Sequence, residues 1–335
     1  MIIQLSPEIT AEQKNQIATQ VAALKYKTNE VKTQKATYLV GIGKTKFDVR
    51  SFGHMPGISD IHIVSDDFKL VSKKWKVNET VIDMGDGVKI GGGNFAMMAG
   101  PCSIEGEDNI YKTIEHLKEN ELQIMRGGVY KPRSSPYSFR GMGLDGLKLW
   151  YKAAKENGIK IVTEVMQVSQ IADMYDYVDM YQVGARNTQN FNLLDELGKV
   201  DKPVMIKRGI SGTIDELMYS AEYVFAGGNE KLLLCERGIR TYERASRNTF
   251  DINAIPILKE KTHLPVIADP SHGIGIRDHV RPVALASTVA GADGVIFEIH
   301  DKPEKAFSDG QQTLDFEESA RLIKKMRQIR EVMAD

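Results

Sequence analysis

Four residues that lie far apart in the sequence could together bind a transition-metal ion. Cys102 follows the apolar run that ends in Ala-Gly-Pro, and His272 follows the run that ends in Ala-Asp-Pro-Ser. Glu298 ends a third apolar run, and Asp309 lies in the segment after it. A thiolate is a soft ligand, an imidazole is borderline and carboxylates are hard, so this set favours Mn²⁺, Fe²⁺, Co²⁺ or Zn²⁺ and not Mg²⁺ alone. A lone cysteine is more often a small buried apolar residue, but here every apolar run ends in a charged or metal-binding group.

Basic side chains stand at or just after the same apolar runs. Taken singly, each could be solvated surface charge. Burying a cation costs several kcal/mol unless it is paired, so a set of buried cations on one face indicates an anionic ligand. Two phosphates and a carboxylate would satisfy such a set. The residues concerned are Arg126, Lys131, Arg133, Arg186, Lys207 and Arg237.

The apolar runs are spaced like the strands of an α/β barrel. Their starts fall roughly 20 to 36 residues apart, which is the length of one strand-helix unit. Eight units in about 240 residues favour a (β/α)8 TIM barrel over an open sheet, and a barrel places its chemistry at the C-terminal ends of the strands. The strands are expected at Phe95–Ala99, Ile124–Gly127, Lys160–Val165, Met180–Gly184, Val204–Lys207, Leu232–Glu236, Pro265–Ala268 and Gly294–Glu298.

The barrel is preceded by a segment whose pattern predicts a small α+β ferredoxin-like domain. Residues 2–5, 31–33, 37–42 and 61–64 are strand-like, a helix should follow the capping box of Thr10 and Gln13, and 47–52 could be helical. Such modules are more often regulatory than catalytic. We therefore divide the chain into a ferredoxin-like regulatory domain (1–65), a Lys-rich linker with an N-terminal hairpin (66–92) and the catalytic barrel (93–335).

Composition excludes several other classes of protein. The chain has 44 basic and 45 acidic side chains, so it lacks the broad positive field that binds nucleic acid or anionic membranes. No apolar run approaches the ~20 residues that cross a bilayer, and the first residues do not resemble a signal peptide. Two cysteines make no disulfide framework. These features predict a soluble, cytoplasmic protein.

Three further candidates have ordinary interpretations. Cys235 is expected to be a packed thiol, because its strand is distant from the strand of Cys102. His300, two residues after Glu298, could lie behind the metal ligands or on the surface, and we favour the surface. The glycines at 91–93 are not followed by a Lys-Ser/Thr phosphate turn, so they do not indicate a nucleotide-binding loop.

From about Asp83 onward the chain resembles the 3-deoxy-D-arabino-heptulosonate-7-phosphate (DAHP) synthases, in the branch related to the 3-deoxy-manno-octulosonate-8-phosphate synthases. The resemblance rests on motifs that fall, in this order, on or just after the expected strand ends. They are AGPCSIE, RGGVYKPRSSPYSFRG, VGARNTQN, IKRG, CERGIRTYE, DPSHGIGIRDHV and FSDGQQ.

The resemblance implies a role for each candidate residue. The metal ligands would be Cys102, His272, Glu298 and Asp309. The phosphoenolpyruvate site would comprise Arg126, Lys131, Arg186, Lys207 and Arg237. The aldose phosphate would meet Lys131, Arg133 and Ser134, with Arg277 as a further contact.

The family reaction joins C3 of phosphoenolpyruvate to an aldehyde carbon, while water attacks C2 and phosphate leaves. Lys131 lies where it could act as general acid toward the developing alkoxide, which makes it the predicted catalytic residue. Two candidates for delivering the water stay open, Glu164 and a metal-bound water.

The co-substrate is predicted from one position of the motif. The octulosonate enzymes are similar but have Ala-Asn where this chain has the single Pro132, which favours erythrose 4-phosphate. Ser134 replaces a commoner threonine and keeps the hydroxyl. Ile276 stands where a further arginine is common, which removes one phosphate contact beside Arg277.

The N-terminal domain resembles a regulatory domain that senses tyrosine or phenylalanine, and we expect a homo-oligomer, either a dimer or a tetramer. Two alternatives remain. One is an octulosonate-8-phosphate synthase that uses arabinose 5-phosphate. The other, from a different class, is a non-catalytic effector-binding regulatory protein.

Overall fold

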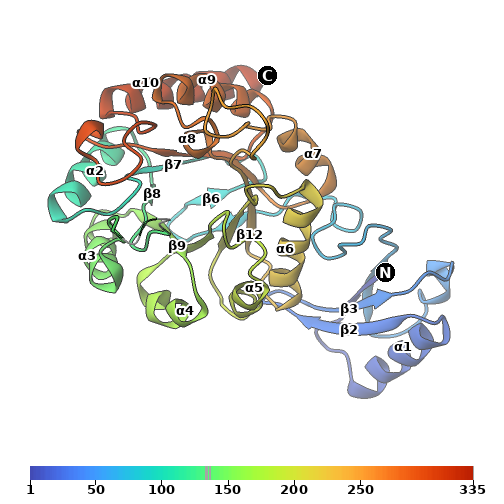
Figure 1. Cartoon of the computed structure of the whole chain (residues 1–335). Coiled ribbons are helices and arrows are strands. Elements are labelled where there is room, and N and C mark those ends of the chain that lie inside the picture. The colour runs from blue at the N-terminus through green and yellow to red at the C-terminus, as the bar shows by residue number, and fades with distance from the viewer. Residues whose placement is uncertain (133–134, 136, 335) are drawn as a thin grey trace.

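The structure is a computed structural model that describes residues 1–132, 135 and 137–334, and it is dominated by a closed barrel of eight parallel strands (Figure 1). Each strand pairs with its neighbours in sequence, and β14 pairs with β7 to close the barrel. The predicted TIM barrel is confirmed. Its strands are β7 (Ala96–Gly100), β8 (Ile124–Arg126), β9 (Lys160–Val165), β10 (Met180–Val183), β11 (Val204–Lys207), β12 (Leu232–Glu236), β13 (Val266–Ala268) and β14 (Gly294–Glu298).

Helices surround the barrel, and the chain supplies local signals for where they start. Thr213 with Glu216 and Asp315 with Glu318 form capping boxes, which satisfy backbone N–H groups at the first turns of α6 and α10. The helices are α2 (Glu107–Glu119), α3 (Gly143–Glu156), α4 (Val168–Met174), α5 (Phe191–Leu197), α6 (Ile214–Ala226), α7 (Ala254–Lys261), α8 (Pro270–Ile274), α9 (Arg277–Val289) and α10 (Phe316–Met333). Among the described helices, none is both long and apolar enough to cross a membrane.

A hairpin closes the N-terminal end of the barrel. It consists of β5 (Ile82–Asp83) and β6 (Lys89–Ile90), and Ile82, Val88 and Ile90 pack into the same cluster as the apolar side chains that fill the barrel interior. Water is therefore excluded from the barrel interior at this end, and the interior is accessible from the C-terminal ends of the strands.

The N-terminal sheet has the strand order of a ferredoxin-like fold. Its strands β1 (Ile2–Leu5), β2 (Lys27–Lys32), β3 (Thr37–Ile42) and β4 (Ile58–His62) are arranged as β2-β3-β1-β4 and are all antiparallel, with the single helix α1 (Ala11–Ala23) between β1 and β2. The expected second helix is reduced to the 3₁₀ turn η1 (Val49–Ser51). Strand β2 begins four residues earlier than predicted, because an edge strand exposed to water carries polar residues that give no apolar signal.

The two faces of this small sheet have different partners. Ile3, Leu5 and Leu39 pack with residues of α1, whereas Ile2, Val31, Tyr38 and Val40 belong to the large core that includes the barrel helices. The Tyr38 ring lies 5.4 Å from that of Trp75 and 6.3 Å from that of Phe225, edge to face in both cases. The sheet is thus sandwiched between its own helix and the barrel.

The stretch after the sheet is not the loose polar linker that its composition suggested. Phe68, Leu70, Val71 and Trp75 are buried, and the Glu222 carboxylate of α6 accepts the backbone N–H groups of residues 69–71 at 2.9–3.1 Å. The lysines between them dominated the composition and hid this apolar spacing. We therefore correct our expectation: this segment is docked on the barrel.

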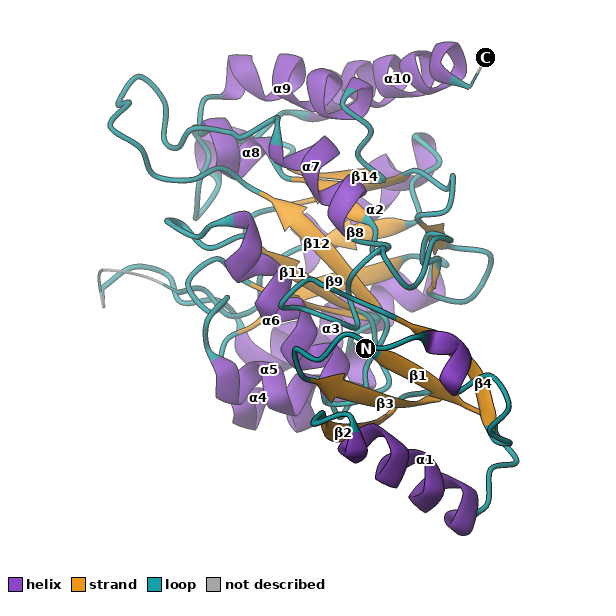
Figure 2. Cartoon of the chain, turned by 90° about the vertical axis from the view of Figure 1, so that its right-hand side faces the viewer, coloured by secondary structure: helices purple, strands orange, loops and turns teal. Residues whose placement is uncertain are grey.

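The N-terminal module lies at the end of the barrel opposite the C-terminal strand ends. Thr33 Oγ1 donates to Glu230 at 2.7 Å, and Gln34 bonds to Asn229 at 3.3 Å, both just before β12 begins. Ser72 forms a β-bridge with Thr262, just before β13. Figure 2 shows the small sheet below the starting end of β12.

Candidate metal centre and anion pocket

The functional side chains follow from the two-residue period of the strands. An apolar residue fills the barrel interior on each strand, and the residue two or four positions later, facing the same way, lies at the C-terminal mouth. Met98 precedes Cys102, Ile124 precedes Arg126, Val162 precedes Glu164, Met180 precedes Gln182, Met205 precedes Lys207, Leu233 precedes Arg237, Ile267 precedes Asp269, and Ile296 precedes Glu298. Alternation along five strands thus places polar groups at the same opening, and Cys102, Arg237 and Asp269 follow just beyond the ends of the other three.

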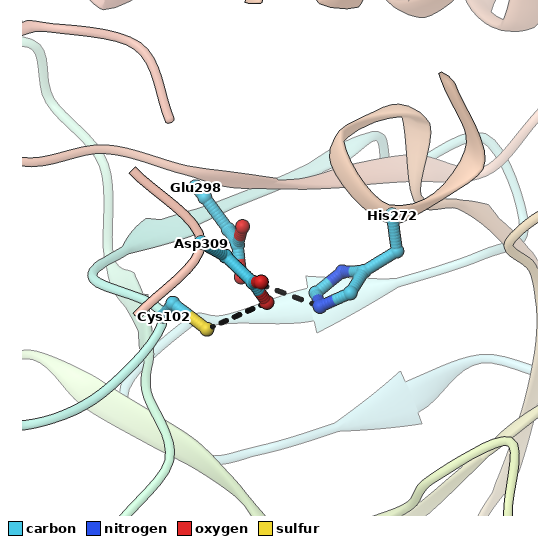
Figure 3. A group of neighbouring side chains, drawn as sticks. All are labelled: Cys102, His272, Glu298 and Asp309. Atoms are coloured by element: carbon cyan, nitrogen blue, oxygen red, sulfur yellow. Dashed lines mark hydrogen bonds and ion pairs between the residues drawn. The ribbon is translucent and has the colours of Figure 1, made fainter. Parts of the chain in front are cut away.

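The four predicted ligands meet at this mouth. Cys102, His272, Glu298 and Asp309 each offer a ligand atom, and these atoms lie within 4.8 Å of one another (Figure 3). Cys102 Sγ is 3.3 Å from an Asp309 oxygen, and His272 Nε2 is 3.3 Å from Glu298 Oε1. Sulfur, nitrogen and carboxylate oxygen around one point suit a divalent transition ion. The residues therefore fit the metal that the sequence predicted.

Asp269 fixes the orientation of the histidine ligand. It is the N-cap residue of α8 and accepts the His272 backbone N–H at 3.1 Å, while its second oxygen lies 2.8 Å from Nδ1. That bond places the proton on Nδ1 and leaves Nε2 free to act as a ligand. The same carboxylate accepts a bond from Lys207. Burial alone would raise the pKa of Asp269, but His272 and Lys207 together hold it well below its usual range.

The acids of the cluster concentrate negative charge at one point. Burial raises the pKa of Glu298, but His272 and Arg126 outweigh it and hold that pKa below its usual value. The pKa of Asp309 falls to about 2, because Arg247 and His272 outweigh the effect of burial. Burial, with Glu298 adding to it, raises the pKa of the Cys102 thiol to about 12. A divalent cation would favour the thiolate and offset the charge of the two carboxylates.

The cations form a pocket beside this cluster. Among the described residues its lining includes seven basic side chains and the two carboxylates of Glu164 and Asp309. The basic residues are Arg126, Lys131, Arg186, Lys207, Arg237, Arg240 and Arg247. The pocket thus has a large excess of positive charge, although the whole chain is nearly neutral.

Two buried arginines lack full compensation within the described part of the chain. Arg126 is 4% exposed; its Nη1 bonds to Glu298 and to the Pro101 carbonyl, but its Nε has no partner there. Burial lowers the pKa of Arg237, and the negative charge of Asp269 offsets this only in part. An unpaired buried donor costs free energy that a bound anion would restore.

Lys131 connects the pocket to the cluster. Its Nζ donates to Cys102 Sγ at 2.9 Å and to the Cys102 carbonyl at 2.8 Å. Arg133 and Ser134, which follow it, lie outside the described residues.

Arg277 does not reach the pocket. Its guanidinium bonds to Asp315 at 2.8 Å and to Glu318 at 2.6 Å, and so joins the first turn of α9 to the first turn of α10. The acids that hold it are about 40 residues away in sequence, so the motif gave no sign of them. The predicted phosphate contact of Arg277 has no support in this geometry.

Two smaller interpretations can be checked. Cys235 is fully buried in the apolar layer inside the barrel, which confirms a packed thiol. His300 is only 6% exposed and bonds to Glu105, so the preference for a surface position was wrong. Its side chain is covered where it meets Glu105 of the loop after β7.

The sequence argument missed several residues of the mouth. Asp269 could have been found from its position two residues after Ile267. Arg240 and Arg247 lie in the long segment between β12 and α7. This segment has no strand or helix periodicity from which the direction of a side chain could be predicted. Gln312 donates to Glu298 at 2.7 Å and accepts from Arg247 at 2.7 Å, and nothing in its local sequence signals either contact.

Comparison with known proteins identifies the relatives of this chain. The model of the DAHP synthetase I family matches residues 76–335. A phospho-2-dehydro-3-deoxyheptonate aldolase of Thermotoga maritima is 43% identical over 99% of this chain and 98% of its own length. A 2-dehydro-3-deoxyphosphooctonate aldolase of Syntrophobacter fumaroxidans is 31% identical over 74% of this chain and 92% of its own.

Solved structures show the same relationship. The crystal structure of the Thermotoga maritima phospho-2-dehydro-3-deoxyheptonate aldolase (DAHP synthase) has a TM-score of 0.79 at 42% identity, covering 99% of this chain and 97% of that one. A truncated form of 3-deoxy-D-arabino-heptulosonate 7-phosphate synthase from Thermotoga maritima has a TM-score of 0.74 at 45% identity, covering 79% and 97%. This chain belongs to the DAHP synthetase I family.

Proposed function

We propose that this protein condenses phosphoenolpyruvate with erythrose 4-phosphate and water to give DAHP and phosphate, the first step of the shikimate pathway. The observation that carries the proposal is that a pocket lined by seven basic side chains adjoins the four-residue cluster and shares His272 and Asp309 with it. Both reactants are polyanions that repel each other, and a preorganised set of cations offsets that repulsion and holds them in contact.

Phosphoenolpyruvate would bind in the cationic pocket. Arg126, whose Nε has no partner among the described residues, lines this pocket together with Arg186, Lys207 and Arg237. We assign the carboxylate and phosphate of this substrate to these four cations together with Lys131. The spread of basic groups suits a ligand with two anionic ends.

The metal that we propose for the cluster is Mn²⁺, Fe²⁺, Co²⁺ or Zn²⁺. When bound, such an ion supplies Lewis-acid polarisation of a carbonyl oxygen. Lys131, whose ammonium lies 2.9 Å from Cys102 Sγ, would then give a proton to the oxygen that becomes a hydroxyl as the C–C bond forms. Glu164, which lines the pocket and accepts from Gln182 at 3.4 Å, is our candidate for orienting the water that adds to C2.

Erythrose 4-phosphate is the preferred aldose, with its phosphate assigned to Lys131, Arg133 and Ser134. The higher identity to the heptonate enzyme than to the octonate enzyme supports this choice over arabinose 5-phosphate. The test is release of phosphate by purified protein from phosphoenolpyruvate with each aldose phosphate in turn. We expect erythrose 4-phosphate to be used far faster, and a preference for arabinose 5-phosphate would assign the octulosonate reaction instead.

Residues 1–65 are proposed to regulate the enzyme in response to tyrosine or phenylalanine, with 66–92 as the connecting segment and 93–335 as the catalytic barrel. Support comes from position: the described pocket and cluster residues all come from 126 onward apart from Cys102, and none from the small sheet. Because the module contacts the far end of its own barrel, an effect on the mouth would pass through a neighbouring copy in a dimer or tetramer. We place this oligomer in the cytoplasm, without nucleic-acid or membrane partners.

Removing residues 1–65 tests this assignment. The truncated protein should keep its activity and lose any inhibition by tyrosine or phenylalanine, measured beside the full-length protein. The matched control is Tyr38→Phe in the full chain, which keeps the ring between Trp75 and Phe225 and should preserve inhibition. Inhibition that survives truncation would contradict the regulatory assignment. A full-length protein that binds an aromatic amino acid but releases no phosphate would indicate a non-catalytic regulatory protein.

A further inference from the structure

Two of the four cluster residues depend on loops for their positions. Cys102 lies in the loop after β7, and Asp309 lies in the long loop after β14. The latter loop leaves and returns at one place, since Leu314 pairs with the end of β14: its N–H donates to the Glu298 carbonyl and its carbonyl accepts the His300 N–H, both at 3.0 Å. Residues 301–313 therefore form a loop whose two ends are hydrogen-bonded to each other. Asp309 lies on the side of this loop that faces the cluster. Something must hold such a loop if Asp309 is to stay at the cluster.

Glu105 joins the two loops by both of its carboxylate oxygens. Oε1 accepts the backbone N–H of Phe307 at 2.7 Å, and Oε2 lies 3.2 Å from His300 Nε2. Because a carboxylate only accepts, His300 Nε2 is the nitrogen that donates to Glu105. Its Nδ1 lies 2.9 Å from the Lys302 N–H and 3.0 Å from the Asp301 carboxylate. The Glu105 side chain is only 9% exposed. One buried acid thus holds the beginning and the inner part of the loop.

A second hydrogen bond, between two serines, also joins the two loops. Ser103 Oγ and Ser308 Oγ are 2.6 Å apart, and they directly follow Cys102 and directly precede Asp309. With Glu105, these serines form what we call the loop clamp: Ser103, Glu105, His300 and Ser308. The clamp runs beside the cluster and contributes no ligand atom to it.

The backbone at Asp309 needs such support. Its φ is +53°, a left-handed conformation that costs a non-glycine residue of the order of 1 kcal/mol. The next residue, Gly310, lies so close to the Pro303 carbonyl that an added Cβ would be 2.2 Å from that oxygen. The loop is tightly folded at this point: Gln312 N–H donates to the Asp309 carbonyl at 3.2 Å and Thr313 Oγ1 donates to the same carbonyl at 2.9 Å. These bonds close the turn locally, and the clamp joins the turn to the loop after β7.

We propose that Glu105 is a positioning residue that fixes the loop after β14 so that Asp309 meets Cys102, His272 and Glu298 before a metal arrives. Groups behind the ligands of a metal commonly change its affinity about 10- to 100-fold when they are removed. This proposal rests on the metal site of the proposed function. It assigns to Glu105 an effect on metal affinity that acts through Asp309.

The test is a double-mutant cycle on metal affinity. The Mn²⁺ dissociation constant is measured by the EPR signal of free Mn²⁺ for wild type, Glu105→Ala, Asp309→Ala and the double variant. Glu105→Ala should weaken binding about 10- to 100-fold. In the Asp309→Ala background the same change should have less than about a twofold effect, because the residue through which Glu105 acts is gone.

Conservative and matched variants separate positioning from general damage. Glu105→Gln keeps one acceptor oxygen, for the Phe307 N–H, but its amide NH2 would face the His300 N–H, so its affinity should lie between those of wild type and Glu105→Ala. Glu107→Ala, on the exposed first turn of α2, is the acidic control and should change nothing. Ser308→Ala is the milder second variant if Glu105→Ala does not fold. It should weaken binding several-fold and be silent in the Asp309→Ala background.

Three results would overturn the proposal. One is unchanged affinity in both Glu105→Ala and Ser308→Ala. Another is a loss of equal size with and without Asp309, which would mean general destabilisation. A wild type that binds no Mn²⁺ would remove the metal site itself, whereas normal wild-type binding with both variants unaffected would leave that site standing and remove only the role of Glu105.

Discussion

The two ends of the barrel differ in the side chains that line them, which are charged at the C-terminal end and apolar at the N-terminal end. At the C-terminal mouth, buried arginines, lysines and acids lie within a few ångströms of one another, and Arg126 keeps a donor without a partner in the described structure. At the other end, the hairpin plugs the barrel with Ile82, Val88 and Ile90, and the N-terminal sheet adds Tyr38 against Trp75. Hydrogen bonds there are matched, as Glu222 shows by accepting three backbone N–H groups.

The difference separates residues that stabilise from residues that react. Hydrophobic burial at the far end lowers the free energy of the folded state, whereas uncompensated cations at the mouth raise it. Such a cost persists where the site needs it for its ligand. The overall charge of the chain conceals this division, because basic and acidic residues balance while the pocket alone gathers seven cations.

The largest difference in activity is expected between variants of the two cysteines, Cys102 at the mouth and Cys235 in the apolar layer inside the barrel. Cys102→Ser should lose its metal and reduce activity more than about 100-fold, since a hydroxyl is a far weaker ligand than a thiolate. Cys235→Ala, in the apolar layer, should keep activity within a few-fold. Metal analysis of both purified proteins checks this, and a full metal content with normal turnover in Cys102→Ser would exclude it as a ligand.

How far the sequence predicted this mouth depends on the period of the strands. Arg126, Glu164, Lys207 and Glu298 follow an interior apolar residue by two positions, so alternation alone placed them together. Arg277 and Arg247 lie on a helix and a loop, where direction depends on contacts with residues distant in sequence. The contacts of these two arginines could therefore be found only from the three-dimensional structure.

The small domain shows the same limit. Its sheet order was predictable because β1 and β3 are apolar enough to be recognised. The second helix was not, since 47–52 form only a short turn. The docking of 66–76 was hidden because Phe68, Leu70 and Trp75 alternate with lysines, which resemble a solvated linker until the barrel surface beside them is known.

The next largest effect should separate the two substrates within the mouth. Arg186→Ala should raise the KM for phosphoenolpyruvate by about 30-fold or more, corresponding to about 2 kcal/mol for the removal of a charged partner from a desolvated site. The KM for erythrose 4-phosphate should change far less. Arg133→Ala should show the reverse pattern. Steady-state kinetics with each substrate varied in turn give the answer, and equal shifts in both constants would mean that the two phosphates are wrongly assigned.

A smaller effect is expected from acid at the far end. His263 donates from Nε2 to the Leu70 carbonyl and accepts from Thr80 at Nδ1, and burial, with Lys76 adding, lowers its pKa to about 3. The unfolded chain takes up this proton near pH 6.5 and the folded one only near pH 3, so stability is full above pH 6.5 and falls as pH decreases through that window.

The comparison of wild type with His263→Gln isolates this contribution. Between pH 7 and pH 5 the wild type should lose about 2 kcal/mol more unfolding free energy than the variant, at 1.36 kcal/mol per unit of pKa difference. Urea unfolding at both pH values measures it. Equal losses in the two proteins would show that His263 is not held neutral at this junction.

The most direct test removes the metal from the protein and adds it back in measured amounts. It decides whether the mouth is a metal-dependent condensation site. Protein treated with a chelator and desalted is assayed for phosphate release from phosphoenolpyruvate and erythrose 4-phosphate while Mn²⁺ is added back. We expect activity to be lost on chelation and to return in proportion to the metal until one ion per chain is bound. Full activity after chelation, or no phosphate release at any metal content, would contradict this assignment of the mouth.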